Sequence, residues 1–233
     1  PAERMQVLRR IPNAKWIYFE KPLASTLSGY VELKSYIKAK KFNGSLNYNL
    51  KNLTNINYIK KHDISSLKIV LTSKHFKEKN SFEHLVHFFY LTEHILSDQI
   101  VSVTKSIECE KIVYSCLTEN GVIALWEVRN GQDNWAVFAE SKELKLEFNV
   151  RNLKLSLDPK INNIFSGLKY SVYEFNANVS QYAFALLEKI FTGGYSYGTL
   201  DSFISGLFSQ RNLLPALERE IQWLEMLEMP REY

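Results

Sequence analysis

The stretch TENGVIALWEVRNGQDNWAVFAES, Thr118–Ser141, contains two Asn-Gly pairs, and each pair precedes an apolar run. Asn-Gly is among the strongest local signals for the tight turn of a β-hairpin, because both residues tolerate a positive φ. The runs VIALWEV and WAVFAE are therefore predicted to be strands joined by turns. VIALWEV also fits two turns of a helix, since so short an apolar run does not separate the two periodicities.

Similar segments extend this sheet on both sides. In ELKLEF, Glu143–Phe148, three apolar residues alternate with charged ones, as expected of a strand with one buried and one solvated face. Further strands are predicted at KWIYFE, SLNYNL, NINYI, LKIVLTS, QIVSVTK, KIVYSCL, NLKLSL and KYSVYEF.

Helical periodicity marks several other segments. The clearest helix is SFEHLVHFFYLTEHILSD, Ser81–Asp98, whose apolar residues recur on one face. An earlier helix is expected to start at Ser25 or Ser28 and to reach about Lys41. Its inward residues are predicted to be Tyr30, Leu33 and Ile37. Three more helices are predicted near the end, at NVSQYAFALLEKIF, TLDSFISGLFS and LLPALEREIQWLEMLE.

These elements predict an α+β fold with a largely antiparallel sheet, a long central helix and a helical C-terminal end. No linker rich in Gly, Ser or Pro interrupts the chain, so we expect a single domain over residues 1–233. Residues 1–12 are expected to form a short basic helix or a loose arm. Residues 178–229 form the predicted C-terminal helical part.

The composition is that of an ordinary globular protein. Of the 233 residues, 45% are hydrophobic and 23% are charged. The start lacks a secretory signal, and no apolar run reaches the roughly 20 residues that span a bilayer. Cys109 and Cys116 form no metal-binding or disulfide pattern and are expected to be buried apolar residues. We expect a cytoplasmic protein without a metal site.

Positive charge is concentrated in one segment. The segment from Lys34 to Lys79 contains eleven lysines and two acidic residues. Its net charge is +9, in a chain whose net charge is +4. Interleaved tyrosines make this segment a candidate for binding nucleic acid, with Lys38, Lys40, Lys41, Lys60 and Lys61 as the contacts to phosphate. The alternative is a solvated lysine face.

Most catalytic motifs are absent. The sequence has no phosphate-binding loop ending in G-K-[ST] and no G-x-S-x-G turn. His84, His87 and His94 share the long helix with Glu83, and we expect them to form a solvated polar face. Glu108-Cys109-Glu110 is an E-x-E pair of the kind found in mono-ADP-ribosyltransferases, although the accompanying serine-rich strand is only approached by ASTLS.

Scattered motifs along the chain resemble the bacterial domain of unknown function 2971 family and its relatives. The matching segments are Thr118-Glu119, Leu125-Trp126, the loop Arg129–Asn134, WAVFAES, Trp16-Ile17-Tyr18, Phe42–Ser45, Arg211 and Glu218-Arg219-Glu220. Gln222 stands where the family has Arg. The resemblance implies an accessory protein of bacteria, often associated with mobile elements or phage defence, and it implies a helical tryptophan segment.

From these motifs we predict one shared cleft. Its candidate acids are Glu119, Glu218 and Glu220, and the residues expected to bind a ligand are Trp16, Tyr18, Trp126, Arg129 and Arg211. The main hypothesis is a defence, toxin or regulatory protein that recognises a phosphate-bearing ligand or macromolecule. One alternative is a small enzyme acting on a nucleotide, for example an NAD-using transferase. The other is a protein-interaction module that uses the C-terminal helices or forms homo-oligomers through them.

The last helix illustrates the third hypothesis. Leu213, Leu217, Ile221 and Leu224 recur at helical spacing, while Glu218, Glu220 and Glu225 are assigned to its polar side. So wide an apolar surface must be covered by the sheet of the same domain or by a partner chain.

Overall fold

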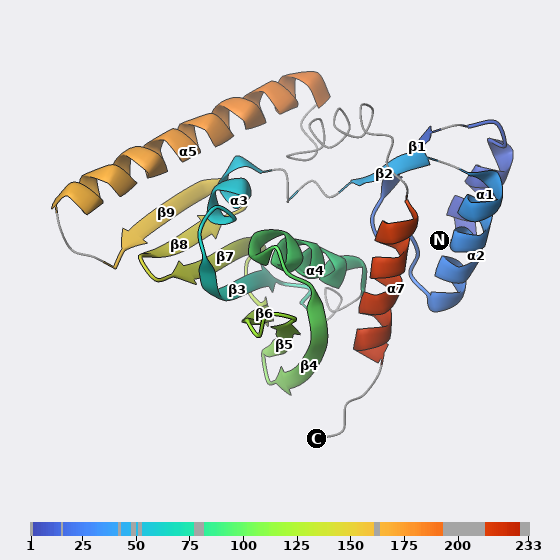
Figure 1. Ribbon diagram of the computed structural model, residues 1–233, viewed down its shortest axis with the longest axis horizontal. Coiled ribbons are helices and arrows are strands. Elements are labelled where there is room, and N and C mark those ends of the chain that lie inside the picture. Colours follow the sequence, from blue (N-terminus) through green and yellow to red (C-terminus); the bar gives the residue numbers. More distant parts are fainter. Residues whose placement is uncertain are drawn as a thin grey trace.

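The computed structural model describes residues 2–14, 16–41, 43–47, 50, 53–76, 82–160, 164–192 and 213–228. Its helices are α1 (Ala2–Arg10), α2 (Leu27–Lys40), α3 (Thr54–Ile59), α4 (Phe82–Leu96), α5 (Ile164–Thr192) and α7 (Leu214–Glu228). Its strands are β1 (Trp16–Glu20), β2 (Asn43–Asn47), β3 (Ile64–Ser73), β4 (Ile100–Glu108), β5 (Lys111–Thr118), β6 (Ile123–Asn130), β7 (Asn134–Ser141), β8 (Leu144–Asn149) and β9 (Lys154–Pro159). The α+β fold is confirmed (Figure 1).

Seven strands form the main sheet, in the order β4-β5-β6-β3-β7-β8-β9. Only β3 and β6 pair in parallel; the other neighbours are antiparallel. Gly121 and Gly131, the second residues of the two Asn-Gly pairs, have φ values of 81° and 149°. VIALWEV is therefore strand β6 with a turn at each end, and the helix that the family resemblance implies there is wrong.

One face of this sheet is covered by helices, and a large core lies beneath them. In Figure 1, α5 runs along β9 and β8, while α3 and α4 lie nearer the middle of the sheet. We call the buried residues here the sheet cluster. Its largest members are Trp126, Trp223, Tyr114, Phe88, Phe89 and Phe148.

A second, smaller core lies around the parallel pair β1–β2, at the right of Figure 1. We call it the N-terminal cluster. It consists of Met5, Leu8, Phe19, Leu23, Ala24, Tyr30, Leu33, Ile37, Leu46, Leu213, Leu217 and Leu224. Gly44 allows β2 to approach β1 closely, because a Cβ at this position would lie 2.2 Å from the carbonyl oxygen of Ile17.

Helix α2 largely matches its prediction. Tyr30, Leu33 and Ile37 are buried as expected. The N-cap is Thr26, however, and neither Ser25 nor Ser28. The Thr26 hydroxyl accepts the backbone N–H of Gly29, which leaves α2 one unpaired donor fewer in its first turn.

Helix α7 connects the two clusters. Trp223 belongs to the sheet cluster, whereas Leu217 and Leu224 belong to the N-terminal cluster. Within the described part of the chain, the apolar side of this helix is thus covered intramolecularly. Glu220 is fully buried, so its predicted place on the polar side of the helix is wrong.

Four other expectations need correction or lie outside the described residues. NINYI falls in helix α3, and KYSVYEF falls in helix α5, so neither is a strand. Cys109 is exposed, while Cys116 is buried as predicted. The segment TLDSFISGLFS lies outside the described residues. No helix in the described part of the chain is long and apolar enough to cross a membrane.

Candidate functional site

Glu220 is the centre of a buried polar cluster between α7, α2 and the loop after β1. Its Oε2 accepts hydrogen bonds from the backbone N–H of Leu23, at 2.7 Å, and from the Tyr30 hydroxyl, at 2.5 Å. Tyr90 of α4 also hydrogen-bonds to this carboxyl. Burial raises the pKa of Glu220 to about 7, although these hydrogen bonds and the charges of Arg4 and Lys21 oppose the shift.

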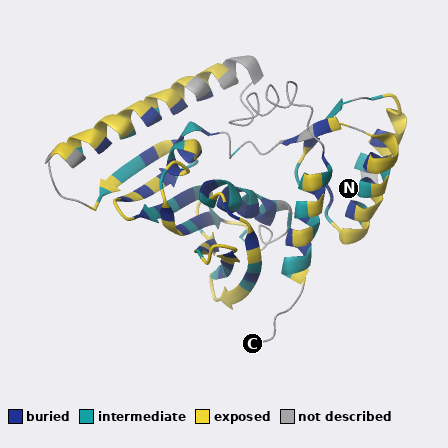
Figure 2. Cartoon of the chain, in the orientation of Figure 1, coloured by how far each residue is buried: buried dark blue, intermediate teal, exposed yellow. Residues whose placement is uncertain are grey.

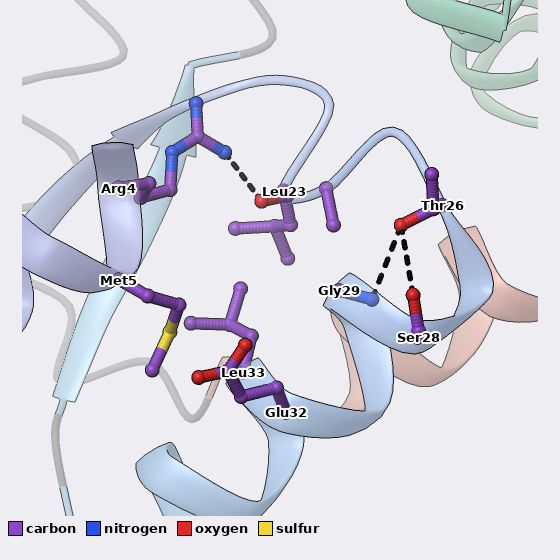
Figure 3. A pocket seen from close by; sticks show the side chains of 9 residues that line it. Arg4, Met5, Leu23, Thr26, Ser28, Gly29, Glu32 and Leu33 are labelled. Atoms are coloured by element: carbon purple, nitrogen blue, oxygen red, sulfur yellow. Dashed lines mark hydrogen bonds between the residues drawn. The ribbon is translucent and has the colours of Figure 1, made fainter. Parts of the chain in front are cut away.

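Arg4 of α1 fixes the same loop from the other side. One guanidinium nitrogen donates to the carbonyl oxygens of Pro22 and Leu23, at 2.6 and 2.5 Å. Figure 3 shows the guanidinium directed at the Leu23 carbonyl, above a hollow of about 230 Å³ that reaches the first turn of α2. Glu220 and Arg4 together bind the backbone on both sides of Leu23, so they restrain the position of Lys21.

The charge of Lys21 in turn acts on His87 of helix α4. The peptide bond between Lys21 and Pro22 is cis. The pKa of His87 lies well below its ordinary value because the imidazole is desolvated and because the positive charges of Lys21 and His84 oppose its protonation. His87 is therefore neutral near pH 7. The expectation that His87 belongs to a solvated polar face is wrong, since its ring packs edge-on against Trp135, 5.7 Å between centroids.

Trp135 connects this histidine to a second hollow. The hollow measures about 370 Å³ and lies at the ends of β3 and β7, lined by Leu71, Ser73, Asp133, Asn134, Trp135, Val150 and Arg151. The lining contains both apolar side chains and several polar groups, a combination typical of sites that bind small polar molecules. The buried Oδ1 of Asn134 accepts no hydrogen bond from the described residues. Lys21, His87 and this hollow make up the candidate site.

The structure does not assemble the predicted cleft. Trp126 is fully buried in the sheet cluster, where its Nε1 donates to Thr92 at 2.9 Å, so it cannot line a cleft. Glu119 lies exposed in the β5–β6 turn. Glu218 is exposed and pairs with Lys34 at 2.8 Å, which lowers the pKa of that carboxyl. Of the three candidate acids only Glu220 belongs to the buried polar cluster.

The predicted ligand-binding residues are also dispersed. Trp16 and Tyr18 lie on β1 with their rings 6.2 Å apart. Arg129 of β6 contacts Thr72 and Glu127 near the Asn130-Gly131 turn. Arg211 lies outside the described residues.

The predicted phosphate contacts do not share one surface. Lys38, Lys40 and Lys41 are exposed at the end of α2, whereas Lys60 and Lys61 are exposed after α3. These helices lie in different parts of the molecule (Figure 1). Nucleic-acid binding by this segment therefore stays a prediction.

Sequence reasoning missed Lys21, His87 and Trp135. A lysine in the connection between a strand and a helix was the available signal, because connections of this kind often carry functional side chains. Nothing local indicated that α4 would pass this loop. Among the described residues, no group of three or more His, Cys, Asp or Glu could bind a metal ion.

No family model matches the chain, and no curated protein does. The resemblance to the domain of unknown function 2971 family accordingly stays a prediction.

Several solved structures share the fold. The chain is similar to an oxidoreductase from Pseudomonas syringae, with a TM-score of 0.61 and 14% identity over 96% of this chain and 71% of that one. It is similar to an NAD binding oxidoreductase from Klebsiella pneumoniae, with a TM-score of 0.52 and 12% identity over 64% and 52%. An inositol dehydrogenase homolog complexed with NAD+ from Azotobacter vinelandii gives a TM-score of 0.55 and 15% identity over 68% and 52%.

At such low identity the similarity shows the fold alone, and this chain spans about half the length, 52%, of the last two proteins. The expected role in defence, toxicity or regulation is nevertheless contradicted, because these structural neighbours are oxidoreductases. They agree better with the alternative of an enzyme that acts with a nucleotide.

The described residues do not form a dinucleotide site by themselves. Such sites commonly bind pyrophosphate at a G-x-G-x-x-G turn before a helix, and the sequence has no such motif. The described glycines near the candidate site have packing roles instead: Gly44 lets β2 approach β1, and a Cβ at Gly29 would lie 3.2 Å from Ala24 and Thr26.

Proposed function

We propose that this chain provides the substrate-facing part of an NAD-linked oxidoreductase whose substrate carries hydroxyl groups. The proposal rests mainly on one observation, a neutral His87 that contacts the wall of a polar hollow and whose pKa is lowered in part by the charge of Lys21. The shared fold supports the same class, since its members include proteins named for NAD binding and for an inositol dehydrogenase.

His87 and Lys21 have the chemistry needed for the proton transfer that accompanies alcohol oxidation. When an alcohol is oxidised to a ketone, its oxygen must lose a proton. The neutral imidazole of His87 is the form that can accept this proton, although burial and the Lys21 charge, which lower its pKa, make it a weak base. The Lys21 ammonium lies close enough to influence His87 and would stabilise negative charge that develops on the substrate oxygen.

The hollow next to Trp135 indicates the substrate class. The lining combines the Asn134 amide with charged groups of both signs, Arg151 and Asp133. The Trp135 ring supplies an amphipathic surface for the carbon face of a ring. A polyol or sugar satisfies both requirements.

Histidine NMR of the full chain tests the pairing of Lys21 with His87. We expect the pKa of His87 to lie below the ordinary histidine value and to rise in Lys21→Met, because the substitution removes a nearby positive charge. The control is Lys40→Met, which removes an exposed lysine from the end of α2 and leaves the His87 titration unchanged. An unchanged pKa in Lys21→Met would contradict the pairing.

Ligand titration tests the substrate class. We expect millimolar inositol or glucose to shift the His87 and Trp135 side-chain signals in the wild-type chain, and to shift them less in Asn134→Ala. If no member of a panel of polyols, sugars and their keto forms moves either signal, the proposed function is wrong.

A further inference from the structure

Helix α5 presents a long apolar stripe to solvent. Its members are spaced alternately by three and four residues: Phe165, Leu168, Val172, Phe175, Val179, Tyr182 and Leu186. All seven are exposed, from 49% for Val172 and Val179 to 85% for Phe165. Figure 2 shows the outer side of α5 coloured as exposed along most of the helix. We call these seven residues the α5 stripe.

The opposite side of α5 is already used by the fold. Tyr170, Ala177 and Ala185 are buried in the sheet cluster. Asn178 accepts the backbone N–H of Leu155 at 2.7 Å, and Glu174 accepts that of Leu157 at 2.8 Å. These bonds to β9 fix the rotation of α5 about its axis, so the helix cannot turn the stripe inward.

The spacing of the stripe indicates what covers it. Alternation of three and four residues averages 3.5 per repeat, the period of helices that pack side by side along their length. The stripe runs about 32 Å at 1.5 Å per residue. A partner helix of similar length, nearly parallel or antiparallel to α5, fits it best.

Area and charge favour an identical helix as that partner. At roughly 100 Å² for each half-exposed large side chain, the stripe would bury about 700 Å² per copy, close to the ~800 Å² per partner of a stable interface. No charged residue belongs to the stripe. Among the described side chains of α5, Lys169 lies over the Tyr170 and Tyr173 rings and Glu174 binds β9, so these charges are engaged within the chain. Two stripes can therefore meet without charge repulsion.

We propose that two copies of this chain associate through their α5 stripes, with the helices antiparallel. In a parallel pair each residue would face its own copy, so narrow layers of Val against Val would alternate with wide layers of Phe against Phe. In the antiparallel pair, Val172 faces Tyr182, Val179 faces Phe175, and Leu168 faces Leu186. These layers have similar widths, which suits a constant distance between the helix axes. The opposed helix dipoles add to the preference.

Sedimentation velocity of the full chain tests the association. We expect a dimer at micromolar concentration for the wild type, and half that mass for Val172→Glu/Val179→Glu, because two charges would be buried at the centre of the interface. The matched control is Ser180→Glu, which adds a charge to an exposed position on the same helix beside the stripe and leaves the dimer intact. Circular dichroism establishes that each variant is folded.

Disulfide cross-linking in a Cys109→Ser background tests the orientation without a disruptive charge. We expect Val172→Cys/Tyr182→Cys to form covalent dimers and Val172→Cys alone to form none. Cross-linking of Val172→Cys alone would show a parallel pair and overturn the proposed orientation. A wild-type chain that sediments as a monomer, or a dimer that survives both glutamates, would overturn the interface itself.

Discussion

At the scale of single residues, the most unusual group is the carboxyl of Glu220. It is fully buried, and three groups bind it: the Leu23 N–H and the hydroxyls of Tyr30 and Tyr90. Burying an ionised carboxylate costs free energy of desolvation, which favours the neutral, protonated form. The pKa of Glu220 is raised to about 7 for this reason. The protein therefore binds a proton here that the unfolded chain releases.

This difference in proton binding predicts a pH dependence of stability. Since the folded pKa of Glu220 is about 7 and the ordinary value is 4.5, its contribution is fully present below about pH 4.5. The contribution is lost as the pH rises through 7. At about 1.4 kcal/mol per pKa unit the loss is roughly 3 kcal/mol. The stability of the wild type relative to Glu220→Gln, measured by urea unfolding, should fall by about this much between pH 5 and pH 8, because Gln resembles the protonated acid and does not titrate. The comparison is needed because His62 and His87, whose pKa values are lowered, add stability as the pH rises through the same range.

Glu218→Gln is the matched control, two residues away on the same helix. Glu218 is exposed, and Lys34 lowers the pKa of its carboxyl. Its ion pair therefore adds stability as the pH rises past the ordinary glutamate value, whereas the contribution of Glu220 is lost as the pH rises. We expect the stability of this variant to follow that of the wild type between pH 5 and pH 8. A difference in stability between the wild type and Glu220→Gln that stays constant from pH 5 to pH 8 would show that Glu220 is ionised in the fold.

At the scale of elements, the two Asn-Gly turns differ in how much they depend on glycine. Gly131 has a φ of 149°, and a Cβ there would lie 2.5 Å from Cγ2 of Thr72 on β3. Gly121 has a φ of 81° and no atom within 4 Å of that position. Gly131→Ala should thus lower the free energy of unfolding by about 1–3 kcal/mol through strain and contact, and Gly121→Ala by less. If urea unfolding shows that both variants lose the same free energy of unfolding, Thr72 moves aside without destabilising the fold.

The elements also show what local sequence can predict. The strands from β3 to β9 were predictable because branched and aromatic residues alternate in them and turn residues separate them. KYSVYEF was misread as a strand because aromatic and β-branched residues such as Tyr170, Val172 and Phe175 are typical of strands. The longer 3–4 alternation from Phe165 to Leu186 appears only over a wider window. Asn residues similarly suggested turns and short strands where α3 packs as a helix in the sheet cluster.

The candidate site was less predictable than the fold. Glu220 was identified as a candidate acid, but its burial depends on how α7 packs against α2 and the loop after β1. Lys21 and His87 are 66 positions apart, and the charge of Lys21 influences His87 only because tertiary packing brings α4 near that loop. Proximity of this kind depends on tertiary packing, which local patterns do not contain.

At the scale of the whole molecule, α7 connects the two clusters through a few strong contacts. Trp223 stacks on Phe89, with ring centroids 4.9 Å apart, and its Nε1 donates to Glu93 at 3.1 Å. Arg219 binds Glu93 and the Ile100 carbonyl. These groups attach α7 to α4 and β4, while Leu217 and Leu224 are buried in the N-terminal cluster.

Trp223→Ala should therefore weaken the N-terminal cluster more than the sheet cluster. Truncation of a buried tryptophan costs about 3–5 kcal/mol, and the sheet cluster retains its own hydrogen-bonded strands. Native-state hydrogen exchange measures the two separately, and we expect faster exchange of α2 amides with little change in β6. Ile107→Ala, at a side chain 73% exposed on β4, is the control and should alter neither. If α2 and β6 amides lose the same protection in Trp223→Ala, the two clusters unfold as one cooperative unit. In that case α7 belongs to a single unit and does not connect two separate ones.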